Sequence, residues 1–388
     1  MLHLSQTLKR LFCHTARRVA RVSEAYPCLV AVLAALLATG CTQPVRTVAI
    51  GGRMYPDPPA AARVQFLTSI GAAGRAAGDG RQGGARSLLF GSTSEPAAGL
   101  TKPAGLAARN GRLYVCDPEN GDILFFDLAA GRSSPWSHPD VSLSKPVAIR
   151  FRDDGNVEVC DAGLEKVFLL TADGALLRAV GLDTLRQVTP DAALPDRFKP
   201  VATAPGPNGT SAVLNAAAHR IELIDLSTGR HAGAWPAGLF APTGMGVAPG
   251  QTIVADAMTR RLTRLDTAGN PAGILGEPGD APGYLAHPKG VAVDEQGVIY
   301  VVDAALQIVQ MFDAEGEFLM SFGGPDEADG GLLAPSGICL DRSCLPHFQQ
   351  YVRPGFAVDH LVFVSNQMGP ARVSVYAFGQ EPATGSTE

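Results

Sequence analysis

The stretch that decides the fold runs from Pro288 to Gly323 and reads PKGVAVDEQGVIYVVDAALQIVQMFDAEGEFLMSFG. It contains four short runs of β-branched, aromatic and aliphatic residues, and the first three runs end at Asp294, Asp303 and Asp313. Short runs of this composition, separated by turns with Asp and Gly, are typical of β-strands joined by hairpins. The stretch therefore predicts a unit of four antiparallel strands.

Related units occur along most of the chain. Each begins with a short phrase around a proline, and the second strand of each ends at Asp or Asn. The prolines lie 43, 54, 42, 46 and 47 residues apart, at Pro103, Pro146, Pro200, Pro242, Pro288 and Pro335. A four-stranded propeller blade has this length. We therefore expect an all-β chain folded as a six-bladed β-propeller.

The unit from Pro288 to Gly323 also resembles an NHL repeat, through its Pro-x-Gly-Val-Ala-Val-Asp, Val-Ile-Tyr-Val-Val-Asp and Met-Phe-Asp phrases. The six units together cover roughly residues 100–378, so the resemblance spans most of the chain. It implies the six-bladed ring that the repeat spacing predicts independently.

The last unit supplies only three strands before the polar tail at residues 380–388. The segment from Arg63 to Gly71 resembles the outer strand of the fifth unit. We expect residues 63–71 to pair into the sixth blade, because an open ring would leave unpaired backbone groups at its edge. Residues 72–99 are then a connecting loop, and 100–379 are the blades.

The sixth unit carries an insertion, residues 341–360, which is rich in aromatic residues. We interpret it as a decoration on one rim of the ring, with a short helix at Leu345–Tyr351.

The amino terminus has the features of an export signal. A basic region precedes an apolar run from Cys28 to Ala38, which is too short to span a bilayer as a helix, and Thr39-Gly40-Cys41 follows. The phrase Leu-Ala-Thr-Gly-Cys resembles the site read by the lipoprotein signal peptidase. Residues 1–40 are therefore expected to be a signal peptide, Cys41 the lipidated residue, and 41–62 a tether to the bacterial outer membrane.

Charge argues against nucleic acid as a partner. The whole chain has 32 basic and 37 acidic residues, and residues 1–40 hold five of the basic and one of the acidic residues. Without residues 1–40, 27 basic and 36 acidic residues remain, which gives a net charge of −9. Affinity for nucleic acid comes mainly from cationic contacts to phosphate.

The other cysteines suggest structural roles. Cys116 and Cys160 occupy equivalent strand positions in neighbouring units, where they are expected to be small buried residues. Cys339 and Cys344 are close enough in the sequence, and in an exported domain, for a possible disulfide. The sequence contains no Cys-x-x-Cys-His, which excludes covalently attached c-type haem.

The residues that end the second strands form a predicted ring of polar side chains at one end of the blades. One interpretation is a site for a cation or polar ligand above the channel. The other, which we favour because the residue recurs in every blade, is that each side chain accepts hydrogen bonds from turn amides. The ring consists of Asp117, Asp161, Asn215, Asp256, Asp303 and Asn366.

No metal ligands, catalytic residues or cofactor site stand out, although ligands contributed by different blades would leave no local spacing pattern. The sequence therefore leaves open whether the chain binds a divalent cation. The histidines considered are His138, His219, His231, His287, His347 and His360.

The sequence is compatible with three functions. The leading hypothesis is a non-enzymatic scaffold that binds other envelope proteins. The terminal blade resembles a group of bacterial NHL lipoproteins, through residues 351–356, 364–370 and 375–379. That resemblance implies multihaem cytochromes or export components as partners. The alternatives are a divalent-metal-dependent hydrolase or lyase, and a carbohydrate- or peptidoglycan-binding propeller.

Overall fold

The computed structural model describes residues 43–44, 46–48, 52–57, 60–71, 99–136, 140–248, 250–325 and 330–381. The predicted signal peptide, Cys41 and nearly all of the predicted connection at 72–99 lie outside these residues. The strands at 43–44 and 46–48 are described by their backbone only.

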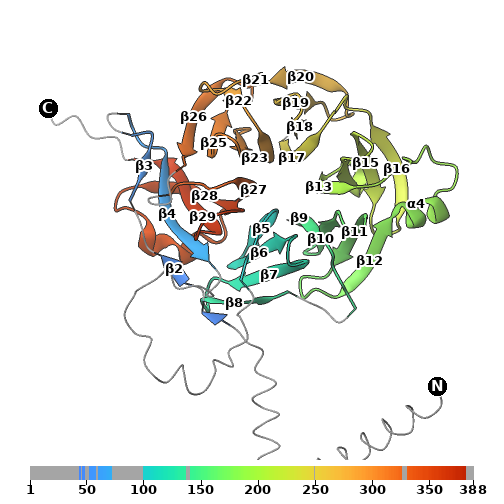
Figure 1. Cartoon of the computed structure of the whole chain (residues 1–388), viewed down its shortest axis with the longest axis horizontal. Helices are drawn as coiled ribbons and strands as arrows, with labels where there is room; N and C mark the ends of the chain where they lie inside the picture. Colours follow the sequence, from blue (N-terminus) through green and yellow to red (C-terminus); the bar gives the residue numbers. More distant parts are fainter. Residues whose placement is uncertain are drawn as a thin grey trace, which may run out of the picture. The chain divides into compact units, whose positions relative to one another are not determined.

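Six antiparallel sheets are arranged around a central channel, as the repeat spacing predicts (Figure 1). Blade 1 comprises β5 (Leu106–Arg109), β6 (Arg112–Asp117), β7 (Asp122–Asp127) and β8 (Arg132–Pro135). Blade 2 comprises β9 (Pro146–Phe151), β10 (Val157–Asp161), β11 (Lys166–Leu170) and β12 (Leu176–Gly181). Blade 3 comprises β13 (Pro200–Pro205), β14 (Ser211–Asn215), β15 (Arg220–Asp225) and β16 (Arg230–Trp235).

Blade 4 comprises β17 (Pro242–Ala248), β18 (Gln251–Asp256), β19 (Arg261–Leu265) and β20 (Pro271–Leu275). Blade 5 comprises β23 (Pro288–Val293), β24 (Ile299–Asp303), β25 (Ile308–Phe312) and β26 (Phe318–Gly323). The described residues add a helix, α4 (Leu182–Val188), after blade 2, and a small parallel pair, β21 (Glu277–Pro278) and β22 (Tyr284–Leu285), before blade 5.

The two sequence markers of each unit face one another across the first two strands. In five blades the repeat proline is the first residue of the inner strand. Its partner on the second strand is the Asp or Asn, as in Pro288 with Asp303 and Pro335 with Asn366. The repeated phrases therefore fix the same end of each blade.

Blade 6 closes the ring with a strand from the other end of the chain, as predicted. It contains β27 (Pro335–Asp341), β28 (Ala357–Asn366), β29 (Val373–Gln380) and then β4 (Val64–Gly71). β4 pairs antiparallel with β29, with Ile70 opposite Val373. This pairing removes the free edge that β29 would otherwise present.

The predicted tether is in part a component of the propeller. The backbone of β1 (Gln43–Pro44) pairs with β8, and that of β2 (Arg46–Val48) pairs with β4. β3 (Met54–Tyr55) also pairs with β4, and both of its side chains are buried. Burial of these apolar side chains ties residues 54–55 to the last blade.

The insertion after β27 is not a rim decoration, and that prediction is wrong. Its side chains Cys344, Phe348 and Phe356 are buried in one core with residues of blade 1, blade 6 and β4. In place of the predicted helix there are two short 3-10 turns, η2 (Leu345–His347) and η3 (Gln349–Tyr351). Aromatic side chains that cover a joint between blades are shielded from water, whereas on a rim they would stay exposed.

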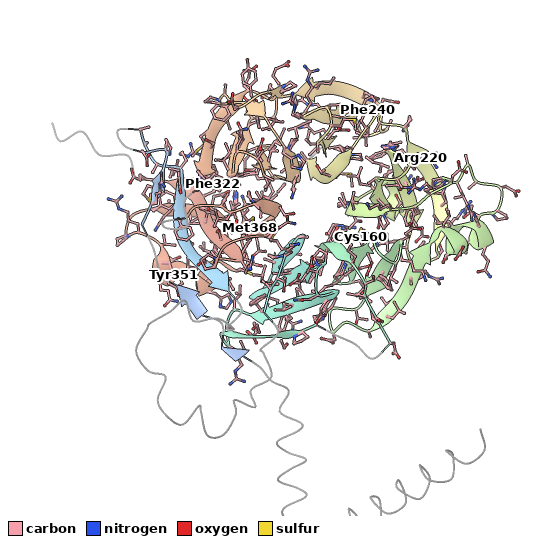
Figure 2. The ribbon with its side chains drawn as sticks, in the orientation of Figure 1. Cys160, Arg220, Phe240, Phe322, Tyr351 and Met368 are labelled. Carbon is pink, nitrogen blue, oxygen red and sulfur yellow. The ribbon has the colours of Figure 1, made fainter. Side chains whose placement is uncertain are left out.

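Hydrogen bonds reinforce this joint, which we call the closure seam: β4, residues 342–356 and the β5–β6 hairpin. The amide of Asn110 donates to Ser343 Oγ at 2.6 Å, and the amide of Gly111 donates to Cys344 Sγ at 3.3 Å. On the other side Gln65 Nε2 donates to the Tyr351 carbonyl at 2.9 Å (Tyr351 is labelled in Figure 2).

Small residues two positions after the repeat proline set how closely the inner strands approach. A Cβ on Gly244 would lie 2.1 Å from the Lys289 carbonyl oxygen, and one on Gly337 would lie 2.3 Å from that of Ala104. Neither space is compatible with a side chain, so the inner strands of neighbouring blades pack backbone to backbone at this level.

Candidate functional site: the mouth of the channel

The inner strands of all six blades enclose a cavity of about 1120 Å³. Each inner strand is the last strand of its sheet, so one of its backbone edges has no ladder partner within the blade. A cavity of this size can hold a small molecule or the end of a polypeptide segment.

Four lysines line the cavity: Lys102, Lys145, Lys199 and Lys289. They are four of the six lysines in the whole chain. The first three immediately precede the repeat prolines of blades 1, 2 and 3, and Lys289 immediately follows that of blade 5. Because these prolines mark the same end of every blade, the four lysines lie at one end of the cavity, which we call the mouth.

The positive charge of the mouth is only partly compensated. Lys102 forms an exposed ion pair with Glu119 at 3.3 Å. Lys145 and Lys199 have no carboxylate within ion-pair distance among the described residues. Lys289 Nζ donates to Gln367 Oε1 at 3.4 Å, and burial lowers the pKa of its ammonium group. The arrangement favours an anionic group that enters the mouth.

The predicted polar ring anchors the mouth and does not line it. Asp161 accepts backbone amides from Ser144, Lys145, Gly163 and Leu164 at 2.7–3.0 Å. Asp117, Asn215, Asp256, Asp303 and Asn366 accept amides of the corresponding loops. All six are buried, and none is among the residues that line the cavity.

The hydrogen bonds from the loop amides change the pKa of Asp256, one of the ring carboxylates. Burial raises the pKa of its carboxyl, but hydrogen bonds from the amides of Phe240, Thr259, Ala241 and Met258 outweigh burial, and the pKa is lowered. The ionised form is therefore stabilised by the loops that it holds in place.

The cysteines are all free thiols within the described residues. Cys116 and Cys160 are fully buried, and burial raises the pKa of both thiols. Cys339 and Cys344, for which a disulfide stays a prediction, are free thiols in this structure, and the Cys344 sulfur accepts the amide of Gly111. Burial raises the pKa of Cys344 to about 12, which keeps the thiol protonated.

Three buried polar clusters escaped the sequence analysis. The Glu158 carboxylate accepts bonds from Arg150 Nη2 at 2.6 Å, Arg152 Nη1 at 2.8 Å and Ser211 Oγ at 2.6 Å. It also accepts the hydroxyl of Thr203, which links blades 2 and 3. Since Arg150 lies in the cavity wall, this pairing directs its charge into the blade.

Glu222 forms the second cluster, within blade 3. It accepts from Arg220 Nε at 2.7 Å and contacts His231 Nε2 at 2.9 Å. Burial raises the pKa of Glu222, but the bonds from His231 and Arg220 outweigh it, and the pKa is lowered.

The third cluster has the residue types of a catalytic relay, but its tyrosine and histidine are not accessible from the cavity. His360 Nδ1 lies 2.8 Å from Asp359 Oδ2, and its Nε2 lies 3.2 Å from the Tyr300 hydroxyl. Tyr300 and His360 are buried, and neither lines the cavity. Burial raises the pKa of the Tyr300 phenol, so its hydroxyl stays protonated and the Tyr300–His360 contact joins blades 5 and 6.

Within the described residues, no group of three or more His, Cys, Asp and Glu side chains is placed to hold a metal ion. The same part of the chain has no helix with the length and apolar character required to cross a membrane.

Comparisons with known proteins agree with the fold. No protein-family model matches the chain. No curated protein matches it either. The solved structures that it resembles include virginiamycin B lyase from Staphylococcus aureus, with 14% identity, a TM-score of 0.50, and coverage of 72% of this chain and 95% of that one.

Another is a gluconolactonase from Xanthomonas campestris, with 13% identity, a TM-score of 0.52, and coverage of 86% of this chain and all of that one. At such identities the likeness shows a common six-bladed propeller fold.

The mouth lysines were missed by the sequence analysis, although a signal was present. Lys-Pro occurs at 102–103, 145–146 and 199–200, once in each of the first three units. A dipeptide that recurs at one repeat position indicates side chains that converge once the ring closes.

Proposed function

We propose that this chain is a non-enzymatic binding propeller of the bacterial envelope, an NHL-type lipoprotein anchored through lipid on Cys41. Its recognition site is the lysine-lined mouth, which takes an anionic group presented by another envelope protein. The observation that carries the proposal is the gathering of Lys102, Lys145, Lys199 and Lys289 around one cavity of an otherwise acidic chain.

Physical chemistry supports binding at this place. Ammonium groups in a recess are less screened by water and salt than those on an open surface, so they attract an anion more strongly. Gln367, Thr243 and Ser336 also line the cavity and supply neutral hydrogen-bonding groups beside the lysines. Such a mixture orients a carboxylate or phosphate without reacting with it.

Multihaem cytochromes or export components remain the partners that we propose, on the resemblance of the terminal blade. They fit the site if they present acidic groups to the mouth. A chain with no Cys-x-x-Cys-His carries no c-type haem of its own, so any part in electron transfer would be through its partners.

The second candidate is a divalent-metal-dependent hydrolase or lyase, which the lyase and gluconolactonase among the similar structures favour. A metal site in the mouth would need oxygen or nitrogen ligands that converge, and positive lysines oppose a cation. Titration of the purified domain with Ca²⁺, Mg²⁺ and Zn²⁺ in a calorimeter separates the two. A stoichiometric ion bound in the channel would support the enzyme.

Pull-down from native envelopes tests the proposal. The tagged full chain, the double variant Lys145→Glu/Lys199→Glu and the matched control Lys166→Glu are compared by quantitative mass spectrometry. Lys166 is exposed on β11 and does not line the cavity. We expect the double variant to lose partners that wild type and control retain. Equal recovery with all three proteins would refute recognition through the mouth.

A further inference from the structure

The apolar side chains around the mouth identify the kind of partner more closely. We propose that the mouth binds an acidic polypeptide segment that also carries apolar side chains. This inference rests on the proposed function, since it names the chemistry of the ligand at the same lysines.

Four large apolar side chains are exposed in loops at the mouth end of the blades. Their exposed fractions are 39% for Leu164, 57% for Phe240, 69% for Met258 and 63% for Met368. They come from blades 2, 4 and 6, and Figure 2 labels Phe240 and Met368. None of the four lines the cavity itself, so they are distributed over the face of the ring that carries the mouth. Large apolar side chains exposed on the same face as a polar site are typical of protein-binding surfaces.

Hydrogen bonds bring the backbone of two of these residues, Leu164 and Met368, close to mouth lysines. The Asp161 Oδ1 atom accepts the amides of both Lys145 and Leu164, at 3.0 and 2.9 Å. Met368 directly follows Gln367, whose side chain contacts Lys289. An exposed apolar residue therefore lies near a mouth lysine in two places, Leu164 near Lys145 in blade 2 and Met368 of blade 6 near Lys289 of blade 5.

Blade 4 has no lysine at the mouth and carries an apolar pair instead. Asp256 accepts the amides of Phe240 and Met258, the first at 2.6 Å and the second at 3.0 Å. Two residues from different loops are thus fixed next to one another by a single carboxylate. Phe240 and Met258 are therefore two exposed apolar residues in neighbouring loops at the mouth end of blade 4.

The recessed position of Lys289 favours a polypeptide over a membrane surface. Lys289 is the only one of the four lysines that is half-buried, whereas the other three are exposed, and it lines the cavity wall beside Gln367. A flat bilayer of anionic lipids meets exposed groups but does not enter a recess. An acidic side chain or a terminal carboxylate does enter it, while apolar neighbours in the same segment rest on Phe240, Met258, Leu164 and Met368.

A free phosphate or small carboxylate would use the lysines alone. Only a ligand with both characters gains from the apolar side chains, because burial of apolar area adds to charge attraction. We expect the affinity for such a ligand to fall as the salt concentration rises. We also expect it to fall, independently of salt, when Phe240 and Met258 are replaced by polar residues.

Fluorescence anisotropy with defined probes tests the inference. The first probe is a fluorescein-labelled twelve-residue peptide in which Asp and Leu are separated by Ser, and the second has every Leu replaced by Ser. Inorganic phosphate and vesicles of phosphatidylglycerol are added as competitors. We expect the first peptide to bind at least about 10-fold more tightly than the second.

Variants of the full chain separate the contributions. Phe240→Ser/Met258→Ser should weaken the Asp-Leu peptide about 10-fold and leave the Asp-Ser peptide unchanged. The control Leu319→Ser removes an exposed leucine on the outer strand β26, away from the mouth lysines, and should change the affinity for neither peptide. Lys145→Glu/Lys199→Glu should weaken both peptides about 10-fold or more. Thermal unfolding verifies that every variant is folded.

The outcomes separate the inference about an acidic and apolar peptide from the proposed binding function of the mouth. If both peptides bind equally and the apolar variants bind like wild type, the inference is wrong while an anion-binding mouth stands. If phosphatidylglycerol vesicles bind more tightly than the Asp-Leu peptide, a membrane surface replaces the polypeptide as ligand. If lysine reversal affects no probe, the proposed function fails as well.

Discussion

The closure seam and the mouth of the channel use similar residue types for opposite purposes. At the seam, Phe348 and Cys344 are buried and polar groups are matched across blades. At the mouth, Phe240 and Met258 are exposed, and Lys145 and Lys199 have no described carboxylate partner. The comparison teaches that aromatic residues which are conspicuous in the sequence can serve stability, whereas an inconspicuous repeated lysine can line the channel mouth, where we propose that binding occurs.

The largest expected effect comes from matched truncations of one phenylalanine in each region. Phe348 packs edge to face on Phe363, with ring centroids 5.7 Å apart. Phe348→Ala should lower the free energy of unfolding by about 3–5 kcal/mol, because it leaves a cavity in the seam. Phe240→Ala should change it by no more than about 0.5 kcal/mol. Denaturation by urea measures both, and similar losses would mean that the mouth loops are also part of the stabilising core.

The next effect compares two glutamates. Glu158→Gln should cost about 3 kcal/mol, because the neutral amide leaves the guanidinium groups of Arg150 and Arg152 without their shared carboxylate. Glu119→Gln at the exposed mouth removes only the pair with Lys102 and should have almost no effect on stability. If Glu158→Gln proves as neutral as its control, the link between blades 2 and 3 does not depend on charge.

A pH dependence follows from Glu222. Its pKa is lowered in the folded chain, so its contribution to stability is complete above the pKa of the unfolded chain, about 4.3, and is lost as the pH falls below it. Glu222→Gln should therefore be less stable than wild type at pH 7, and the gap should narrow toward pH 3. Urea denaturation at several pH values measures this, and a constant gap would contradict the role of the carboxylate.

The smallest effect on stability is expected at the mouth itself. Lys145→Glu/Lys199→Glu changes two exposed side chains without a described ion pair, so the free energy of unfolding should change by no more than about 1 kcal/mol. A large loss of stability in urea would show that these lysines are structural and would remove the contrast between the two regions.

Much of the fold was predictable because the repeat carries it. The prolines and the Asp or Asn residues recur at blade length, and in five blades the pair proved to face one another, as Pro288 does Asp303. The closing strand was predictable because the last unit lacked its fourth strand.

The insertion was not predictable, because Phe348 and Phe356 pack against residues that are far away in the sequence, such as Leu67 and Leu113. Only the closed ring brings these segments together. The same applies to the mouth: Lys102 and Lys289 are 187 positions apart, and Lys289 lies on the other side of its proline.

Site-specific photo-crosslinking in cells tests the central claim most directly. The photoreactive residue p-benzoyl-phenylalanine replaces Lys145 at the mouth or Lys166 on β11 in the full chain, and crosslinked products are identified by mass spectrometry. The account predicts that one or a few envelope proteins with acidic segments are captured from position 145 and not from position 166. Capture from position 166 with none from position 145 would contradict it.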